Sequence, residues 1–139
     1  MDDDARSGDV PLSRAQSTGE RASELGFDWD DPWGPMAKVR EELQELEEVI
    51  GEEGGAVRAR CVAEVGDLLF SVVNLARHLD VDAATALEAT IRKFERRFDR
   101  VQQLSAAGGK SVDELTIEEL EQLWERAKRE EGTGVDDQG

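Results

Sequence analysis

The chain has 139 residues and a mass of 15.4 kDa, enough for one ordinary domain with one hydrophobic core. Its 33 acidic and 17 basic residues give a formal net charge of −16, which repels phosphate backbones and anionic lipids and so argues against nucleic-acid and membrane partners. The first residues form no signal-peptide pattern and no apolar run is long enough to span a bilayer, so we expect a soluble, cytoplasmic protein.

The composition favours helices over strands. Tyrosine is absent and aromatic residues make up 5% of the chain, which does not suit a sheet. We therefore expect an all-α fold, a bundle of about five helices. Caps and helix breakers predict these helices at about 13–25, 36–50, 56–79, 80–104 and 113–130. Asp80 or Asp82 would cap the fourth, and Asp113 or Thr116 would open the fifth. The domain would cover residues 12–131, between flexible acidic tails at 1–11 and 132–139.

An aromatic loop lies between the first two predicted helices. It contains Phe27, Trp29 and Trp33, and it is closed by helix-breaking residues. The pattern leaves two interpretations open, because these rings either pack in the core or form a pocket for a nucleobase.

Two pairs of carboxylates are placed to meet on neighbouring helices. Glu42 and Glu45 share one face of the second predicted helix, and Glu64 and Asp67 share one face of the third. A short turn at 51–55 makes these helices an antiparallel hairpin, and both pairs lie at similar distances from the turn. With one cysteine and one histidine in the chain, the ligands at hand are oxygens. Four carboxylates therefore predict a hard cation, Mg²⁺ or Mn²⁺.

The third predicted helix is apolar on nearly its whole circumference, apart from one narrow polar stripe that includes Glu64 and Asp67. Five helices of this length cannot cover every side of it, and exposed apolar surface is unfavourable by about 25 cal/mol per Å². We therefore expect a homo-oligomer, at least a dimer, in which a helix of a second chain covers this surface.

Basic residues accompany the carboxylates. Lys38 lies four residues before Glu42 and Arg60 four before Glu64, a spacing that also suits simple ion pairs along a helix. On the fourth predicted helix Lys93 and Arg97 share a face, either as a surface charge cluster or as ligands of a triphosphate. On the last, Trp124 and Lys128 repeat this spacing, and the indole either packs in the core or stacks on a base.

At these residues the sequence resembles a known family. The strings EELQE at 41–45 and EVGD at 64–67 are similar to the E-E-x-x-E and E-x-x-D signature of the MazG family of nucleoside triphosphate pyrophosphohydrolases, within the all-α NTP pyrophosphatase superfamily. The resemblance extends through GFDW at 26–29, VNLARHL at 73–79 and KFERRF at 93–98 to Trp124 and Lys128. The resemblance covers about residues 12–131, and the chain is most similar to the C-terminal domain of two-domain MazG proteins. We therefore expect this chain to lack the N-terminal domain of that form.

The resemblance implies roles for individual residues. Glu42, Glu45, Glu64 and Asp67 correspond to the Mg²⁺ ligands of the family. Lys38, Arg60, Lys93, Arg97 and Trp124 fall where the family contacts nucleotide, and Lys128 is a further basic candidate. The reaction implied is NTP + H₂O → NMP + PPi, in dimers or dimers of dimers whose active sites are shared between subunits.

The mechanism expected from this assignment uses no covalent nucleophile. A Mg²⁺ ion held by the carboxylates would neutralise the triphosphate and activate a water, with Glu41 or an unliganded glutamate oxygen as proton acceptor. Lys93 and Arg97 would stabilise charge on the phosphoryl oxygens. Three alternatives stay open: a narrow house-cleaning specificity for dUTP, dCTP or a damaged nucleotide; a more distant phosphoribosyl-ATP pyrophosphohydrolase; and a non-catalytic helical dimerisation or regulatory module.

Overall fold

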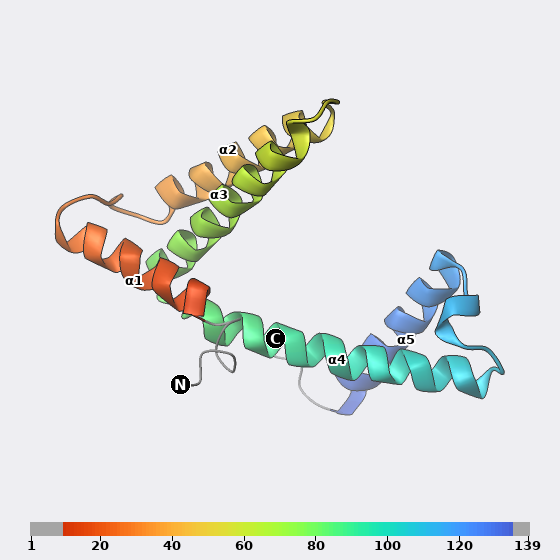
Figure 1. Cartoon of the computed structure of the whole chain (residues 1–139). Coiled ribbons are helices and arrows are strands. Elements are labelled where there is room, and N and C mark those ends of the chain that lie inside the picture. Colours follow the sequence, from red (N-terminus) through yellow and green to blue (C-terminus); the bar gives the residue numbers. More distant parts are fainter. Residues whose placement is uncertain (1–9, 135–139) are drawn as a thin grey trace, which may run out of the picture. The chain divides into compact units, whose positions relative to one another are not determined.

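The computed structural model describes residues 10–134, with side chains described to Gly132, and this part of the chain contains α-helices but no strand (Figure 1). The all-α prediction is therefore confirmed. The helices are α1 (Val10–Glu24), α2 (Trp33–Ile50), α3 (Val57–His78), α4 (Ala83–Ala107), the short 3₁₀ helix η2 (Val112–Glu114) and α5 (Ile117–Gly134).

The helix boundaries follow the capping residues where such residues exist. Asp82 caps α4, because its carboxylate accepts hydrogen bonds from the backbone N and the hydroxyl of Thr85 at 3.0 and 2.7 Å. Thr116 caps α5, since its hydroxyl accepts the backbone N–H of Glu119 at 3.1 Å and the Glu119 carboxylate accepts that of Thr116 at 2.8 Å. Of the two alternatives for each helix, Asp80 lies instead in the α3–α4 connection with a φ of 63°, and Asp113 lies in η2.

The outer ends of the first and last helices differ from the prediction. α1 begins at Val10 rather than near residue 13, and α5 continues to Gly134 rather than ending near 130. Neither extension carries a strong sequence signal, because residues 132–134 contain two glycines that usually end helices. The predicted tails at 1–11 and 132–139 lie for the most part outside the described residues.

The chain divides into two compact units, residues 1–86 and 87–139. In the first, α2 and α3 run side by side as the predicted antiparallel hairpin, and α1 packs against α3 (Figure 1). Val49 of α2 and Val73 of α3 are buried in the interior of this unit. The side chain of Gln16 ties α1 to the start of α4, since it accepts the backbone N–H of Ala83 at 2.9 Å and donates to the carbonyl of Val81 at 3.1 Å.

The second unit pairs α5 with most of α4. Val101 and Leu104 of α4 and Ala127 of α5 are buried, and Phe94 contacts Trp124 with ring centroids 5.0 Å apart. Within the described residues, three arginine–glutamate ion pairs join the helices, from Arg96 and Arg97 to Glu131 and from Arg100 to Glu130. This small interior is stabilised by polar contacts between α4 and α5 as well as by apolar packing.

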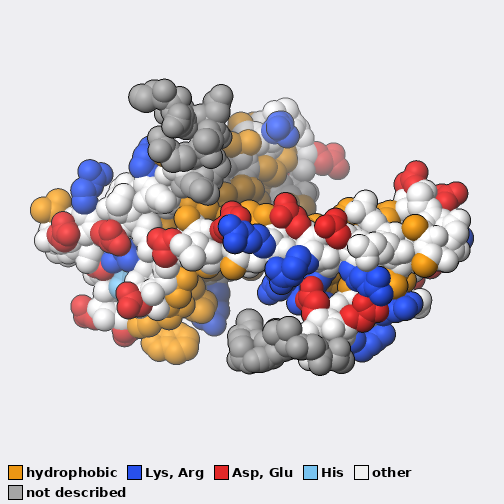
Figure 2. All heavy atoms as spheres, turned by 90° about the horizontal axis from the view of Figure 1, so that it is seen from below, with side chains coloured by type: hydrophobic (Ala, Val, Ile, Leu, Met, Phe, Trp, Pro, Cys, Tyr) orange, Lys and Arg blue, Asp and Glu red, His pale blue; other side chains and the backbone are white. Residues whose placement is uncertain are grey.

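Large hydrophobic side chains reach the surface in both units (Figure 2). On α3 the exposed set includes Val62, which is 62% exposed, and also Val65, Leu69, Phe70 and Val72. The helix that the sequence marks as apolar on almost every side is thus covered on only part of its circumference by α1 and α2. Among residues 10–134, no helix combines the length and the hydropathy needed to cross a lipid bilayer.

Candidate active site

The α2–α3 hairpin gathers carboxylates from both helices. Oxygen atoms of Glu42, Glu64 and Asp67 lie within 4.8 Å of one another, and so do oxygen atoms of Glu41, Glu42 and Glu45. Glu42 belongs to both groups and therefore lies at the centre of the cluster. The arrangement agrees with the hairpin argument from sequence. Glu45 lies within 4.8 Å of the carboxylates on its own helix, and its carboxyl also interacts with that of Glu64 on α3.

The central carboxylates are buried without enough partners. Glu42 is only 4% exposed, and its Oε2 atom and the Oε2 atom of Glu64 are buried with no hydrogen-bond partner in the described part of the chain. A buried charged oxygen without a partner is unfavourable by roughly 1–3 kcal/mol or more. A proton or a cation at this position would remove that penalty.

The carboxylates also raise one another's energy when ionised. The negative charge of Glu42, followed by partial burial and the charges of Glu64 and Glu41, raises the pKa of Glu45 above its ordinary value. The cluster consists of oxygen donors, two of them orphaned and buried. A hard divalent cation such as Mg²⁺ fits this donor set, since it prefers oxygen ligands and would offset the repulsion.

Gly66 lies between Glu64 and Asp67 on the exposed side of α3. A Cβ atom added to Gly66 would meet no atom of the described residues within 4 Å, so there is open space at this position of α3. The backbone of α3 is therefore exposed at Gly66.

The basic residues of the first unit make different contacts. The Nζ atom of Lys38 lies 3.2 Å from Oε2 of Glu41 and 3.4 Å from Oε1 of Glu42, and the hydrogen bond to Glu41 is the main cause that raises the lysine pKa. Lys38 thus forms the ion pair expected from its spacing and also lies at the cluster. Arg60 pairs with Glu52 in the turn after α2 rather than with Glu64, so the i, i+4 pair with Glu64 is not formed.

The predicted nucleotide contacts of the second unit lie on α4 and α5. The guanidinium of Arg97 stands 6.0 Å from the centre of the Trp124 ring, and its Nε atom donates to Oε1 of Glu131 at 2.7 Å. Lys93 is half-buried one turn earlier on α4. Lys128 is exposed and lies 3.8 Å from Oε2 of Glu125. The structure therefore brings Arg97 and Trp124 together, which the sequence spacing could not predict.

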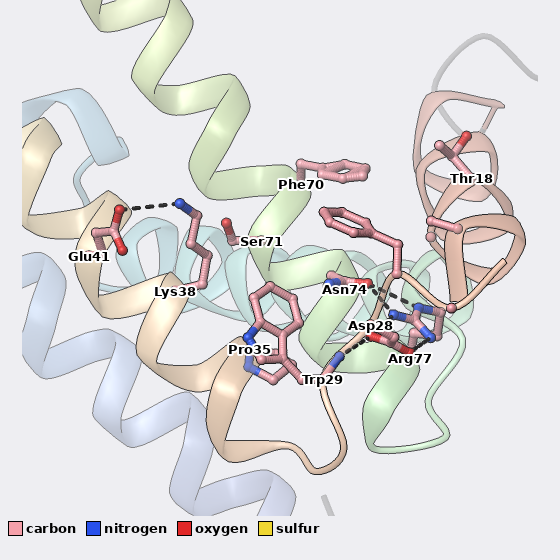
Figure 3. A pocket seen from close by; sticks show the side chains of 14 residues that line it. Thr18, Asp28, Trp29, Pro35, Lys38, Glu41, Phe70, Ser71, Asn74 and Arg77 are labelled. Carbon is pink, nitrogen blue, oxygen red and sulfur yellow. Dashed lines mark hydrogen bonds and ion pairs between the residues drawn. The ribbon is translucent and has the colours of Figure 1, made fainter. Parts of the chain in front are cut away.

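A pocket of about 810 Å³ opens beside the carboxylates in the first unit (Figure 3). Its walls come from α1, the aromatic loop, α2 and α3, with Lys38 and Glu41 at one end and Thr18 at the other. Phe27 and Trp29 line it and are 82% and 44% exposed, whereas Trp33 is exposed and does not line it. The aromatic loop is therefore not part of the core.

The loop that carries these rings is held by a polar contact that sequence reasoning missed. Arg77 of α3 donates to both carboxylate oxygens of Asp28 at 3.0 and 2.8 Å, and Nε2 of His78 lies 2.7 Å from Oδ1. The hydrogen bonds from Arg77 are the main reason that the pKa of Asp28 lies far below its usual range. His78, the single histidine of the chain, thus has Asp28 as its partner. The sequence signal for this contact is limited to the position of Asp28 between Phe27 and Trp29.

Trp29 is positioned by close packing as well. Its indole lies on Gly34, where a Cβ atom would come within 2.3 Å of Cδ1, and its edge approaches the ring of His78 with centroids 6.5 Å apart. The backbone N–H of Trp29 donates to Oδ1 of Asp28 at 2.9 Å. These contacts fix Trp29 as one wall of the pocket.

Fold and site together define an all-α domain with an acidic cluster on a helical hairpin. Residues 34–102 match the family model of the MazG nucleotide pyrophosphohydrolase domain, and this range includes all four predicted metal ligands. The chain belongs to the MazG family.

Relatives support this assignment over most of the chain. It is 44% identical over 117 residues to the nucleoside triphosphate pyrophosphohydrolase/pyrophosphatase MazG of Thermotoga maritima, a match that covers 84% of this chain and 44% of the relative. It is 42% identical over 122 residues to the nucleoside triphosphate pyrophosphohydrolase of Escherichia coli K12, covering 86% of this chain and 45% of that protein. The chain thus spans less than half the length of these curated relatives.

Proposed function

We propose that the chain is a divalent-cation-dependent nucleoside triphosphate pyrophosphohydrolase that converts NTP or dNTP and water to the monophosphate and diphosphate. The observation that carries this proposal is the pair of buried, unpartnered oxygens on Glu42 and Glu64 beside Asp67. Such oxygens favour a bound cation, and the triphosphate would supply further oxygen ligands to it. The names of the relatives support the same reaction.

Glu42, Glu45, Glu64 and Asp67 would hold the cation, Mg²⁺ with Mn²⁺ as a substitute. When bound, the ion supplies a Lewis acid that neutralises triphosphate charge and promotes attack by water. Glu41 or a free glutamate oxygen at the cluster accepts the proton of the attacking water. Lys38, which already contacts Glu41 and Glu42, keeps a positive charge at the same place and can shift to a phosphoryl oxygen.

The second unit would supply the remaining contacts to the nucleotide. Lys93 and Arg97 stabilise the charge on the transferring and leaving oxygens, Trp124 offers its ring to the nucleoside, and Arg60 and Lys128 add positive charge at the periphery. The exposed apolar side of α3 favours a homo-oligomer, at least a dimer, in which these residues of one subunit complete the carboxylate site of another. The enzyme would act in the cytoplasm on the nucleotide pool, in a house-cleaning role.

The pocket favours a second, narrower candidate function. Phe27 and Trp29 line a cavity that begins at Lys38 and Glu41, next to the carboxylate cluster, and its size suits a nucleoside. A base held between these rings would give a preference for one nucleotide, such as dUTP, dCTP or a damaged base. A purely structural dimerisation module has no use for the orphaned carboxylates.

Product analysis with Mg²⁺ across canonical and damaged NTPs and dNTPs tests the proposal. Release of monophosphate and diphosphate that is abolished by a chelator is the expected result. Similar rates on all substrates support the general enzyme, and a strong preference that Trp29→Ala abolishes supports the narrow one. If the purified protein hydrolyses none of these nucleotides with Mg²⁺ or Mn²⁺ present, the proposed activity is wrong and the non-catalytic dimerisation or regulatory module is favoured.

A further inference from the structure

Two of the arginine–glutamate pairs between α4 and α5, Arg97–Glu131 and Arg100–Glu130, differ in how many guanidinium nitrogens form hydrogen bonds. Arg100 engages all three of its nitrogens, since Nε and Nη2 donate to Glu130 at 2.6 and 3.3 Å and Nη1 donates to Gln103 at 3.0 Å. Arg97 uses only Nε, which donates to Oε1 of Glu131 at 2.7 Å. No hydrogen bond from the described residues reaches the two terminal nitrogens of Arg97.

Burial makes this difference informative. The Arg97 side chain is only 14% exposed, whereas that of Arg100 is 42% exposed. A guanidinium carries five N–H donors. A mostly buried guanidinium with only one of these donors in a hydrogen bond still needs acceptors for the others. Its terminal nitrogens form the planar fork that binds carboxylates and phosphates through two parallel hydrogen bonds.

Glu131 holds that fork in one orientation. Its Oε1 atom fixes the Nε end of the guanidinium, and the face of the Trp124 ring 6.0 Å away restricts rotation about the side chain. Its Oε2 atom lies 4.0 Å from Nε of Arg96, an exposed residue that draws the second oxygen away from Arg97. The contact with Glu131 therefore occupies Nε of Arg97 and leaves its two terminal nitrogens for an anion.

We infer that Glu131 is a positioning residue, which orients Arg97 so that its two terminal nitrogens bind the oxygens of the substrate triphosphate. The inference rests on the proposed function, in which Arg97 contacts the triphosphate. Glu131 does not touch the substrate and acts through Arg97. The opposite role, in which Glu131 competes with the triphosphate for Arg97, predicts effects of the opposite sign.

The test combines kinetics with binding of inorganic triphosphate, measured by calorimetry on the full chain. Glu131→Ala should lower kcat/KM and triphosphate affinity about tenfold, as expected when a supporting hydrogen bond to a functional side chain is removed. Glu131→Gln should lose less, because its amide oxygen still accepts the Nε–H. Glu130→Ala is the matched control, since it removes the neighbouring carboxylate from Arg100 and should leave both quantities within about twofold of wild type.

Double substitution separates positioning from a general effect on the fold. Arg97→Ala/Glu131→Ala should be no worse than Arg97→Ala alone, because Glu131 has nothing to orient once the guanidinium is gone. Additive losses, unchanged affinity in Glu131→Ala, or tighter triphosphate binding in that variant would each overturn the inference. Wild-type protein that hydrolyses no nucleotide yet binds triphosphate in a Glu131-dependent way would overturn the proposed function and support the positioning role.

Discussion

Lys38 Nζ lies 3.4 Å from Oε1 of Glu42, while Oε2 of the same carboxylate is buried and has no hydrogen-bond partner within residues 10–134. One lysine therefore neutralises one side of the central carboxylate only. An oxygen of Glu42 also lies within 4.8 Å of oxygens of Glu64 and Asp67, which add negative charge instead of relieving it. A carboxylate that is neutralised on one side only is expected where a cation from outside the chain is to supply the remaining positive charge.

Asp67→Asn should reduce turnover by roughly 100-fold or more, because loss of a direct ligand exceeds the 10- to 100-fold effect typical of outer-shell partners. The substitution keeps the shape of the side chain, so the helical circular dichroism should persist. Steady-state rates with Mg²⁺ measure the effect. Glu48→Gln, which removes an exposed carboxylate of α2 outside the cluster, is the control and should keep wild-type activity. Near-normal turnover in Asp67→Asn would remove Asp67 from the metal site.

Mg²⁺ should raise the thermal midpoint of the wild-type protein, since a ligand bound to the folded state alone adds about 2.7 kcal/mol of stability at a concentration 100 times its Kd. Without metal, Glu45→Gln should have a higher midpoint than wild type, because it removes a charge that Glu42 and Glu64 repel. With Mg²⁺ that order should reverse. Differential scanning fluorimetry with and without a chelator measures both effects, and an equal Mg²⁺ shift in the two proteins would argue against a ligand role for Glu45.

The raised pKa of Glu45 also sets a pH dependence. In the metal-free protein, a carboxyl with a raised folded-state pKa favours folding at pH values where it is protonated, and this contribution is lost as the pH rises through the raised pKa. The same proton competes with Mg²⁺. We therefore expect the Mg²⁺-induced shift of the midpoint to shrink as the pH falls through that pKa, and to shrink less in Glu45→Gln. A Mg²⁺ shift with the same pH dependence in both proteins would contradict this coupling.

Asp28 should make stability depend on pH in the opposite sense. Its folded-state pKa is lowered by Arg77, so its contribution is complete above the ordinary aspartate pKa of about 3.9 and declines as the pH falls below that value. The difference in free energy of unfolding between wild type and Asp28→Asn should thus be largest near neutrality and smaller at acidic pH. Urea denaturation at several pH values measures it. A difference that stays constant down to about pH 2 would mean that the contact with Arg77 does not stabilise the fold.

The proposed shared site predicts complementation between inactive chains. Asp67→Asn retains Arg97, and Arg97→Ala retains the carboxylates, so a mixed dimer contains one intact site and one doubly altered site. Random mixing of equal amounts should restore about one quarter of wild-type activity. Sedimentation at low micromolar concentration should show no 15.4 kDa species. An active monomer would refute the oligomer, and a dimer without complementation would refute only the shared site.

How much the sequence predicts depends on whether a contact is local. Caps such as Thr116 act over three residues, and the meeting of Glu42 with Glu64 follows from one short turn between two helices, so both were accessible to pattern reasoning. The contact of Arg77 with Asp28 spans 49 residues, and no periodicity indicates it. The partner of Arg97 likewise lies on another helix, 34 residues away.

The partial failures have the same origin. Spacing correctly paired Lys38 with Glu42 but also suggested Glu64 for Arg60, whereas Glu52 lies nearer once the turn after α2 has formed. The sequence does not decide whether the aromatic loop packs in the core, because exposure is a property of the whole fold. Its position on the pocket wall depends on Gly34 leaving room for the Trp29 indole.

Gly66 has different consequences for the stability of the chain and for its proposed activity. Alanine at this helical position would favour α3 by roughly 0.5–1 kcal/mol, and no atom of the described residues lies within 4 Å of where its methyl group would be. A laboratory selection for heat resistance alone should therefore enrich alanine. A selection for turnover also depends on the exposed side of α3, where a second subunit is proposed to lie. If glycine is retained under selection for turnover but lost under selection for heat resistance, another molecule contacts this side of α3 during the proposed reaction.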